Sequence, residues 1–358
     1  MKMLSEEVHQ KLNNDALIRE RDEWFSRLSD LFENRPNAYN ARHVFTLDGF
    51  VPRPVNERQA YYEPEAWINA CLELAAALPP FIGQRFAPVC VEYPIYGVHF
   101  IDKVLGANVF NLQGDSEEQD VFQWNASYLT TPVGSLQMPD LDSNETWALA
   151  KRAAMAFLEA DVKLPLYGMP TLASPLNILL NLYGQEALVA MCDDEEAVMH
   201  DLRIITDVIG AMHKWHREHI PEAQLQPVIS WNRTQPPGFG QICGCTTQLI
   251  SGDFYRKFAA PLDDELLAIY PHGGMIHLCG SHTQHLNCFR DMPHLRAVQV
   301  NDRAAEDLKA YLEGLREDQI IYVNPCPGMP AEEAVRLSGG KRIVLAAAID
   351  APEMPKEE

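Results

Sequence analysis

Short apolar runs alternate with longer amphipathic stretches along most of the chain, and this alternation restricts the possible folds more than any other feature. Each run has the length and the aliphatic character of a buried strand. The runs are "FAPVCVEY" (86–93), "VKLPLYGMP" (162–170), "QPVISW" (226–231), "GGMIHLCG", "LRAVQVND", "QIIYVNPC" and "KRIVLAAAID". Strands that alternate with helices form parallel βα units, so the sequence predicts an α/β fold.

The amphipathic stretches between the runs have helical spacing. Helices are expected at residues 5–34, 61–78, 143–160, within 184–219 and at 251–270. Pro64 suits the first turn of its helix, and Pro261 predicts a break within 251–270. In the long helix, Asp193 is the expected N-cap, and Glu196 follows three residues later as in a capping box.

About eight βα units in a chain of 358 residues predict a single (β/α)8 TIM barrel with an N-terminal helical extension. The extension would comprise residues 1–83 and the barrel residues 84–358. A doubly wound sheet is the alternative, but no Gly-rich phosphate loop of the Rossmann or P-loop type follows any of the runs. No linker rich in Pro, Gly or Ser divides the chain, which favours one domain.

Charge and composition exclude several classes of partner. The net charge of −21 argues against a nucleic acid. No uninterrupted apolar run reaches the roughly 18 residues of a membrane span, and the charged N-terminus lacks the apolar core of a signal peptide. We therefore expect a cytoplasmic protein without a membrane partner, whose eight cysteines stay reduced.

The stretch "GGMIHLCGSHTQHLNC" (273–288) concentrates metal-binding residue types. His277 and Cys279 project to the same face because residues i and i+2 of a strand do so, and Gly280 ends the strand. In a parallel barrel this end opens onto the active-site face, and zinc takes such nitrogen and sulfur ligands. The pair predicts a metal site; the alternative is a core cysteine beside a hydrogen-bonded histidine. Later residues are expected to be solvated or supporting groups (His282 and His285) or helix packing (Cys288).

A zinc site requires a third ligand, for which the sequence offers several cysteines. Cys326 in "VNPCPG" (323–328) ends another predicted strand and is slightly favoured. Cys243 and Cys245 in "CGC" have the same i, i+2 spacing and are the alternatives, and otherwise we expect them to contact substrate.

Polar residues at two further strand ends complete the predicted site. Glu92 and Asp302 are candidate catalytic groups, and Tyr93 and Asn301 are candidate substrate contacts. Capping and solvation of the strand ends is the alternative role for all four.

The "HLCG" segment and the C-terminal half around it resemble the uroporphyrinogen decarboxylase superfamily, most closely its zinc-dependent, corrinoid-linked methyltransferase branch. Further segments follow in the same order, over roughly residues 60–350: "SPLNILLNLYGQEALVAMCDDEEAVMHDL", "CTTQLISGDFYRKFAAPL", "VQVND" and "VNPCPG". The resemblance implies a (β/α)8 barrel with its site at the carboxyl ends of the strands.

The resemblance also implies a reaction. A bound Zn²⁺ would act on a small thiol or a methylated substrate, and the methyl group would move to or from a corrinoid (methylcobamide). The corrinoid would be supplied by a partner protein, because the chain contains no D-x-H-x-x-G cobalamin motif. The direction of transfer is left open.

Two departures from the family keep other functions open. The Arg-rich segment with which the decarboxylases bind substrate carboxylates is replaced by "LDGFVPRPVNERQAYY". The methyltransferases have their last zinc cysteine near the C-terminus, where this chain has Ala348 in "AAAIDAP". The alternatives are a metal-free lyase that works through carboxylates such as Asp302, and a non-catalytic accessory protein of a corrinoid methyltransferase system.

Overall fold

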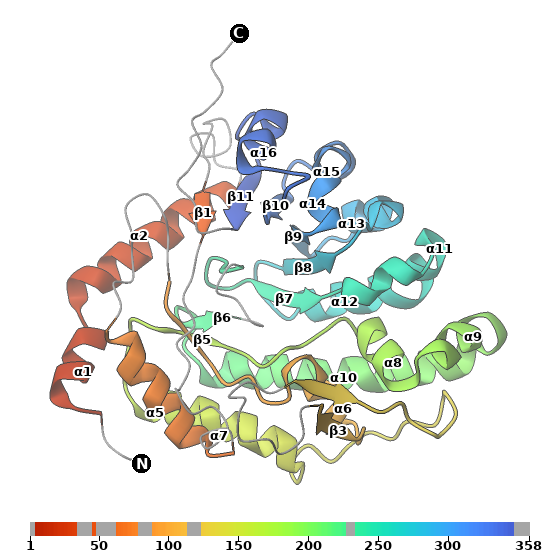
Figure 1. Cartoon of the computed structure of the whole chain (residues 1–358), viewed down its shortest axis with the longest axis horizontal. Helices are drawn as coiled ribbons and strands as arrows, with labels where there is room; N and C mark the ends of the chain where they lie inside the picture. The colour runs from red at the N-terminus through yellow and green to blue at the C-terminus, as the bar shows by residue number, and fades with distance from the viewer. Residues whose placement is uncertain are drawn as a thin grey trace. The chain divides into compact units, whose positions relative to one another are not determined.

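Parallel pairing joins all neighbouring strands of the two larger sheets, as the alternation of apolar runs and helices predicts. The computed structural model of the chain describes residues 4–33, 45–47, 62–77, 88–112, 123–226 and 233–346 (Figure 1). One sheet has the order β1-β11-β10-β9-β8-β7 and the other β2-β5-β6, while β3 and β4 form an antiparallel pair. The predicted α/β class with parallel sheets is confirmed.

The strands are short, and those of the larger sheets are buried where their side chains are described. Their bounds are β1 Phe45–Leu47, β2 Cys90–Glu92, β3 Val109–Asn111, β4 Trp124–Ala126, β5 Leu166–Gly168, β6 Leu225–Gln226, β7 Gly240–Cys243, β8 Gly274–Cys279, β9 Leu295–Asn301, β10 Ile320–Val323 and β11 Ile343–Ala346. Each predicted run overlaps a strand, although residues 227–231 of the third run lie outside the described residues.

The helices follow the predicted stretches with shifted ends. Their bounds are α1 Glu6–Leu12, α2 Asp15–Phe32, α5 Pro64–Ala75, α6 Phe100–Val104, α7 Glu145–Glu159, α8 Pro175–Tyr183, α9 Gln185–Asp193, α10 Glu195–His219, α11 Gly252–Phe254, α12 Ala260–Leu267, α13 Leu286–Asp291, α14 Arg303–Glu306, α15 Leu308–Gly314 and α16 Ala331–Ser338. Single turns of 3₁₀ helix form η1 (Gly97–His99), η2 (Cys245–Leu249) and η4 (Thr283–His285), and a π-helical turn forms η3 (Tyr255–Ala259).

Three local predictions need correction. The stretch 5–34 forms two helices, because Asn13 leaves the helical conformation and its side chain bonds to the carbonyl oxygens of His9 and Asp161. The N-cap of α10 is Asp194, whose carboxylate accepts from Ala197 N at 3.1 Å, and not Asp193. Pro261 does not break its helix, because it lies in the first turn of α12, where no N–H is required.

The chain divides into two compact units. The first comprises Met1–Asn14, Val51–Leu78 and Cys90–Ile229, and it contains the sheet β2-β5-β6 and the long helices α7 and α10. The second comprises Asp15–Phe50, Pro79–Val89 and Ser230–Glu358, and it contains the six-stranded sheet. Within the second unit, α13, α15 and α16 lie on one side of the sheet (Figure 1). The division at residue 83 and the closed barrel stay predictions.

Among the described residues, none of the helices has both the length and the apolar character needed to cross a bilayer.

Candidate metal centre

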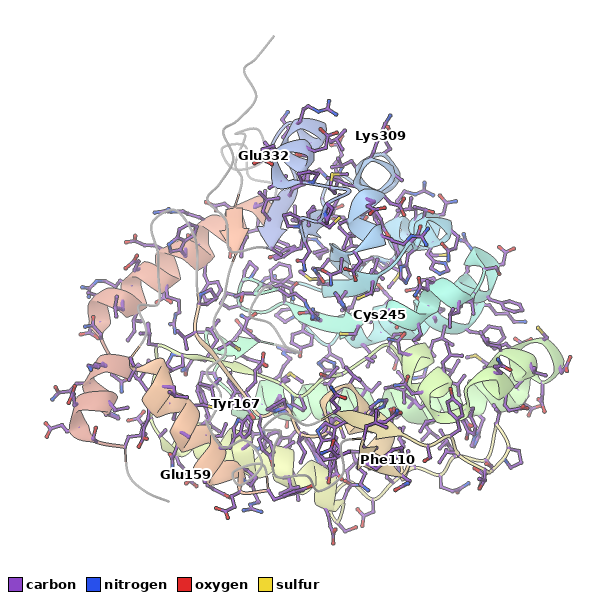
Figure 2. All side chains as sticks on the ribbon, viewed as in Figure 1. Phe110, Glu159, Tyr167, Cys245, Lys309 and Glu332 are labelled. Atoms are coloured by element: carbon purple, nitrogen blue, oxygen red, sulfur yellow. The ribbon has the colours of Figure 1, made fainter. Side chains whose placement is uncertain are left out.

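One imidazole nitrogen and two sulfur atoms come together at the ends of β7 and β8. Cys245 begins η2 directly after β7, and His277 and Cys279 lie at the end of β8. Their three potential ligand atoms lie within 4.8 Å of one another, and Cys279 Sγ lies 3.1 Å from His277 Nε2. Cys245 is labelled in Figure 2, beside the strand that precedes it. No second group of this kind occurs in the part of the chain that the structure describes.

The turn after β7 brings Cys245 to this position. Cys243 is the register partner of His277 on β8, and Gly244 N extends the ladder by donating to His277 O at 2.8 Å. The backbone then turns, and Gly244 O accepts from the backbone N and the hydroxyl of Thr247, at 3.1 and 2.7 Å. The turn directs Cys245 across the end of β8 instead of continuing along β7.

A buried amide orients the imidazole of His277. Gln299, the register partner of His277 on β9, places Oε1 in hydrogen-bond contact with His277 Nδ1. Its Nε2 donates to Asn324 Oδ1 at 3.0 Å, just beyond β10. Because an amide oxygen only accepts, Nδ1 carries the proton and Nε2 presents its lone pair to the cysteines. This is the tautomer in which Nε2 can bind a metal ion.

The two candidate sulfur ligands influence each other's ionisation. The Cys245 thiol donates to Cys279, and this contact lowers the pKa of Cys279 against the effect of burial. The same contact and burial raise the pKa of Cys245. The Arg233 guanidinium also favours the Cys279 thiolate, and its Nη1 lies 3.7 Å from Cys243 Sγ. The contact therefore favours the thiolate form at Cys279 and the thiol form at Cys245.

The residues fit a zinc ion. A tetrahedral site with Zn–S distances of about 2.3 Å and Zn–N distances of about 2.0 Å separates its ligand atoms by about 3.5 to 3.8 Å. The three ligand atoms of Cys245, His277 and Cys279 lie at most 4.8 Å apart, which is close to these separations. A set of two sulfur atoms and one imidazole nitrogen suits zinc, whereas Ca²⁺ and Mg²⁺ bind oxygen ligands. Since metals bind thiolates, uptake of the ion would release the Cys245 proton.

Cys326, the third ligand that the sequence slightly favoured, is not a member of this group. It lies in a tight turn in which its backbone pairs with Met329, and its Sγ lies 3.8 Å from Asp302 O. The "CGC" alternative supplies Cys245 instead. Cys326 follows a predicted strand, whereas Cys245 follows β7, for which the sequence predicted no strand, and the turn at Gly244 brings it to the cluster.

The remaining predicted residues are distributed over both units. Cys243 adjoins the cluster through the β7–β8 register, and Asn301 is the register partner of Cys279 on β9. Asp302 is exposed and has a φ of 49°.

Glu92 and Tyr93 belong to the first unit, at the end of β2. Both are buried, with exposed fractions of 2%. The Glu92 carbonyl accepts from Trp67 Nε1 at 2.7 Å, and the Tyr93 ring packs edge-on against the same indole. Burial raises the pKa of Tyr93. The functional roles of Glu92, Tyr93, Asn301 and Asp302 stay predictions.

Sequence reasoning missed one supporting residue, Gln299. Gln299 is completely buried, and the signal for it was a single amide inside the apolar run "AVQV". His282 and His285 are also completely buried, which rules out the solvated role considered for them and leaves the supporting one.

Comparison with known proteins shows a likeness of fold to a solved structure. No protein-family model matches the chain, and no curated protein matches it in sequence. The fold is similar to that of a methyltransferase from Methanosarcina mazei, with a TM-score of 0.60 over 92% of this chain and 94% of that one. The two sequences are 14% identical, so the likeness is one of fold.

Proposed function

We propose that the chain is a zinc-dependent methyltransferase that moves a methyl group between a corrinoid protein and a small thiol or methylated substrate. The observation that carries this proposal is the cluster of Cys245, His277 and Cys279 at the ends of adjacent parallel strands. The fold likeness to the Methanosarcina mazei methyltransferase supports the same class of reaction. Closure of the strands into a (β/α)8 barrel is part of the proposal.

In this proposal Cys245, Cys279 and His277 Nε2 hold the ion. Three protein ligands are typical of a catalytic zinc site, which keeps a further position for water or substrate. When bound, zinc supplies a Lewis acid that favours the anionic form of a thiol or polarises a methylated heteroatom. Gln299 keeps the His277 lone pair directed at the ion.

Flanking residues would contact the substrate. Cys243 and Asn301 lie beside the ligands in the strand register, and Arg233 adds a positive charge next to Cys243. We keep Glu92 and Asp302 as proposed catalytic groups and Tyr93 as a proposed substrate contact. The corrinoid would come from a partner protein, since the sequence contains no D-x-H-x-x-G motif.

Metal analysis tests the ligand set. Protein purified without chelators should contain about one zinc per chain, and Cys245→Ser should lose it because a three-ligand site depends on every ligand. Cys326→Ser is the matched control and should retain zinc. Loss of zinc from the Cys326 variant with retention in the Cys245 variant would contradict the assignment and restore Cys326 as the third ligand.

Spectroscopy tests the reaction. Methyl-Co(III) and Co(I) corrinoids absorb at different visible wavelengths, so methyl transfer is visible when the zinc-loaded protein is mixed anaerobically with methylcobalamin and a panel of thiols. The reverse reaction starts from Co(I) with methoxylated or methylamine donors. A zinc-loaded protein inactive in both directions, including with a co-encoded corrinoid protein, would favour the accessory-protein alternative. Methyl transfer by the zinc-free protein would contradict the proposed role of zinc.

A further inference from the structure

A single imidazole connects the two backbone segments that carry the candidate sulfur ligands. His282 is completely buried, with Nδ1 2.9 Å from Gly280 O and Nε2 3.2 Å from Gly244 O. Gly280 directly follows Cys279, and Gly244 directly precedes Cys245. A carbonyl oxygen only accepts and a neutral imidazole has one N–H, so one tautomer of His282 donates to Gly280 O and the other donates to Gly244 O. The tautomer protonated at Nε2 is the one that links the two segments.

The segment after β8 (residues 280–288) contacts the segment after β7 (residues 244–252) at several points. Every contact runs from a side-chain donor to a backbone carbonyl oxygen within residues 244–252, which fixes the path of that backbone. Besides His282, the contacts are Gln284 Nε2 to Gln248 O at 3.2 Å and to Ile250 O at 3.4 Å, His285 Nε2 to Thr247 O at 2.9 Å and Cys288 Sγ to Gly252 O at 3.6 Å.

Two glycines permit this close approach. A Cβ atom on Gly252 would lie 2.5 Å from the backbone oxygen of Gln284. Gly280 has a φ of 76°, a conformation that glycine adopts without strain, and a Cβ atom there would collide with the Gln248 side chain. The backbone on both sides is therefore shaped for contact between the segments.

We propose that His282 is a positioning residue that sets the separation of Cys245 and Cys279, so that a metal ion binds through both sulfur atoms. This inference rests on the proposed metal site. Cys245 lies beyond the β7–β8 ladder, where its position depends on the turn at Gly244 and on what holds that turn. The contact from Nε2 to Gly244 joins the two segments, whereas the contact from Nδ1 to Gly280 lies within one segment.

Two amide substitutions separate these contacts. The amide nitrogen of glutamine reaches about as far from the backbone as Nε2 does, and that of asparagine only about as far as Nδ1. His282→Gln should therefore keep a donor for Gly244, whereas His282→Asn should lose it. We expect the asparagine variant of the full chain to bind zinc about 10- to 100-fold more weakly in a chelator competition, and the glutamine variant to stay close to wild type.

Cobalt substitution measures how many sulfur atoms bind the metal ion, which a general loss of stability would not change. Thiolate-to-Co(II) charge-transfer absorption reports the number of sulfur ligands. It should fall by about half in His282→Asn and stay near the wild-type value in His282→Gln, with circular dichroism to verify that both variants are folded. Equal zinc affinity and equal absorption in all three proteins would overturn the proposal.

A metal-free experiment separates this inference from the proposed function. Brief treatment of the metal-free full chain with the thiol oxidant diamide, followed by mass spectrometry, measures formation of the Cys245–Cys279 disulfide. We expect slower formation in His282→Asn than in His282→Gln, and equal rates would overturn the positioning role. If wild type binds neither zinc nor cobalt, the proposed function fails, and this comparison still tests His282.

Discussion

Gln299 is the residue on which the orientation of His277 depends. Its Oε1 contacts His277 Nδ1 and its Nε2 bonds to Asn324, so replacement by leucine leaves the buried His277 and the half-buried Asn324 without this partner. We predict that Gln299→Leu binds zinc about 10- to 100-fold more weakly and loses about 1–3 kcal/mol of unfolding free energy. Chelator competition and urea denaturation measure the two effects.

Gln299→Glu is the control for this prediction. Glutamate keeps an acceptor for His277 Nδ1, so zinc affinity should be retained even if the free energy of unfolding falls. If both variants lost affinity in proportion to their loss of stability, the orienting role of Gln299 would be wrong.

Among the site residues, the sequence predicted those whose relative positions follow from their spacing along a single strand. His277 and Cys279 follow from strand periodicity alone. Cys245 remained one of several cysteines, because its place in the cluster depends on a turn that brings two strand ends together. Gln299 carries no local pattern, since its partners, His277 and Asn324, lie on other segments of the chain.

Helix α10 is joined to the loop before α7 through one buried carboxylate. Asp201 accepts from Gly134 N at 2.8 Å, Leu136 N at 3.1 Å and the Tyr183 hydroxyl at 2.7 Å. Because each hydrogen bond to a charged group contributes about 1.5–3 kcal/mol, we predict that Asp201→Ala lowers the free energy of unfolding by at least about 3 kcal/mol. Urea denaturation measures the loss.

Asp207 on the same helix is the matched control. It is half exposed and forms a surface ion pair with Arg203 at 3.5 Å. Asp207→Ala should cost no more than about 0.5 kcal/mol, as exposed helical pairs do. Equal losses in the two variants would show that Asp201 does not hold the loop.

Helices with a regular pattern of apolar residues were predicted from the sequence. Elements that form because of contacts with distant segments were not. The amphipathic stripes located α5, α7 and α10 to within a few residues. Strand β7 was missed because "GFGQIC" contains two glycines and a glutamine, and tertiary pairing with β8 outweighs that weak propensity. The break between α1 and α2 depends on the bond from Asn13 to the distant Asp161.

The net charge of −21 acts on the whole molecule through self-repulsion. We predict that the free energy of unfolding rises by about 1 kcal/mol when NaCl increases from about 0.01 M to about 1 M, because the Debye length falls from about 30 Å to about 3 Å. Thermal unfolding at neutral pH measures the effect.

The same titration near the sequence pI of 4.9 provides the control, since the net charge is close to zero there. The salt effect should shrink at that pH. A melting temperature that fell with salt at neutral pH would contradict the prediction and indicate that attractive ion pairs dominate.

At the scale of the whole chain, periodicity predicted the class of fold but not its subdivision. Parallel pairing follows from alternating strands and helices. The two compact units each combine three separate stretches of chain, and the consecutive helices α1 and α2 belong to different units. No local composition marks such boundaries, because they are set by contacts between residues far apart in sequence.

All three candidate ligands lie within residues 245–279, on neighbouring strands. A nascent chain would therefore possess its complete set of protein ligands while β9, β10 and β11 were still to be translated. The loop to be closed is short, so its entropic cost is modest. A centre completed by a cysteine at position 348 would instead be incomplete until that residue had been translated, after β9, β10 and β11. Metal loading at the proposed site would thus be compatible with co-translational folding, and a bound ion would stabilise β7 and β8 before β9, β10 and β11 pair with them.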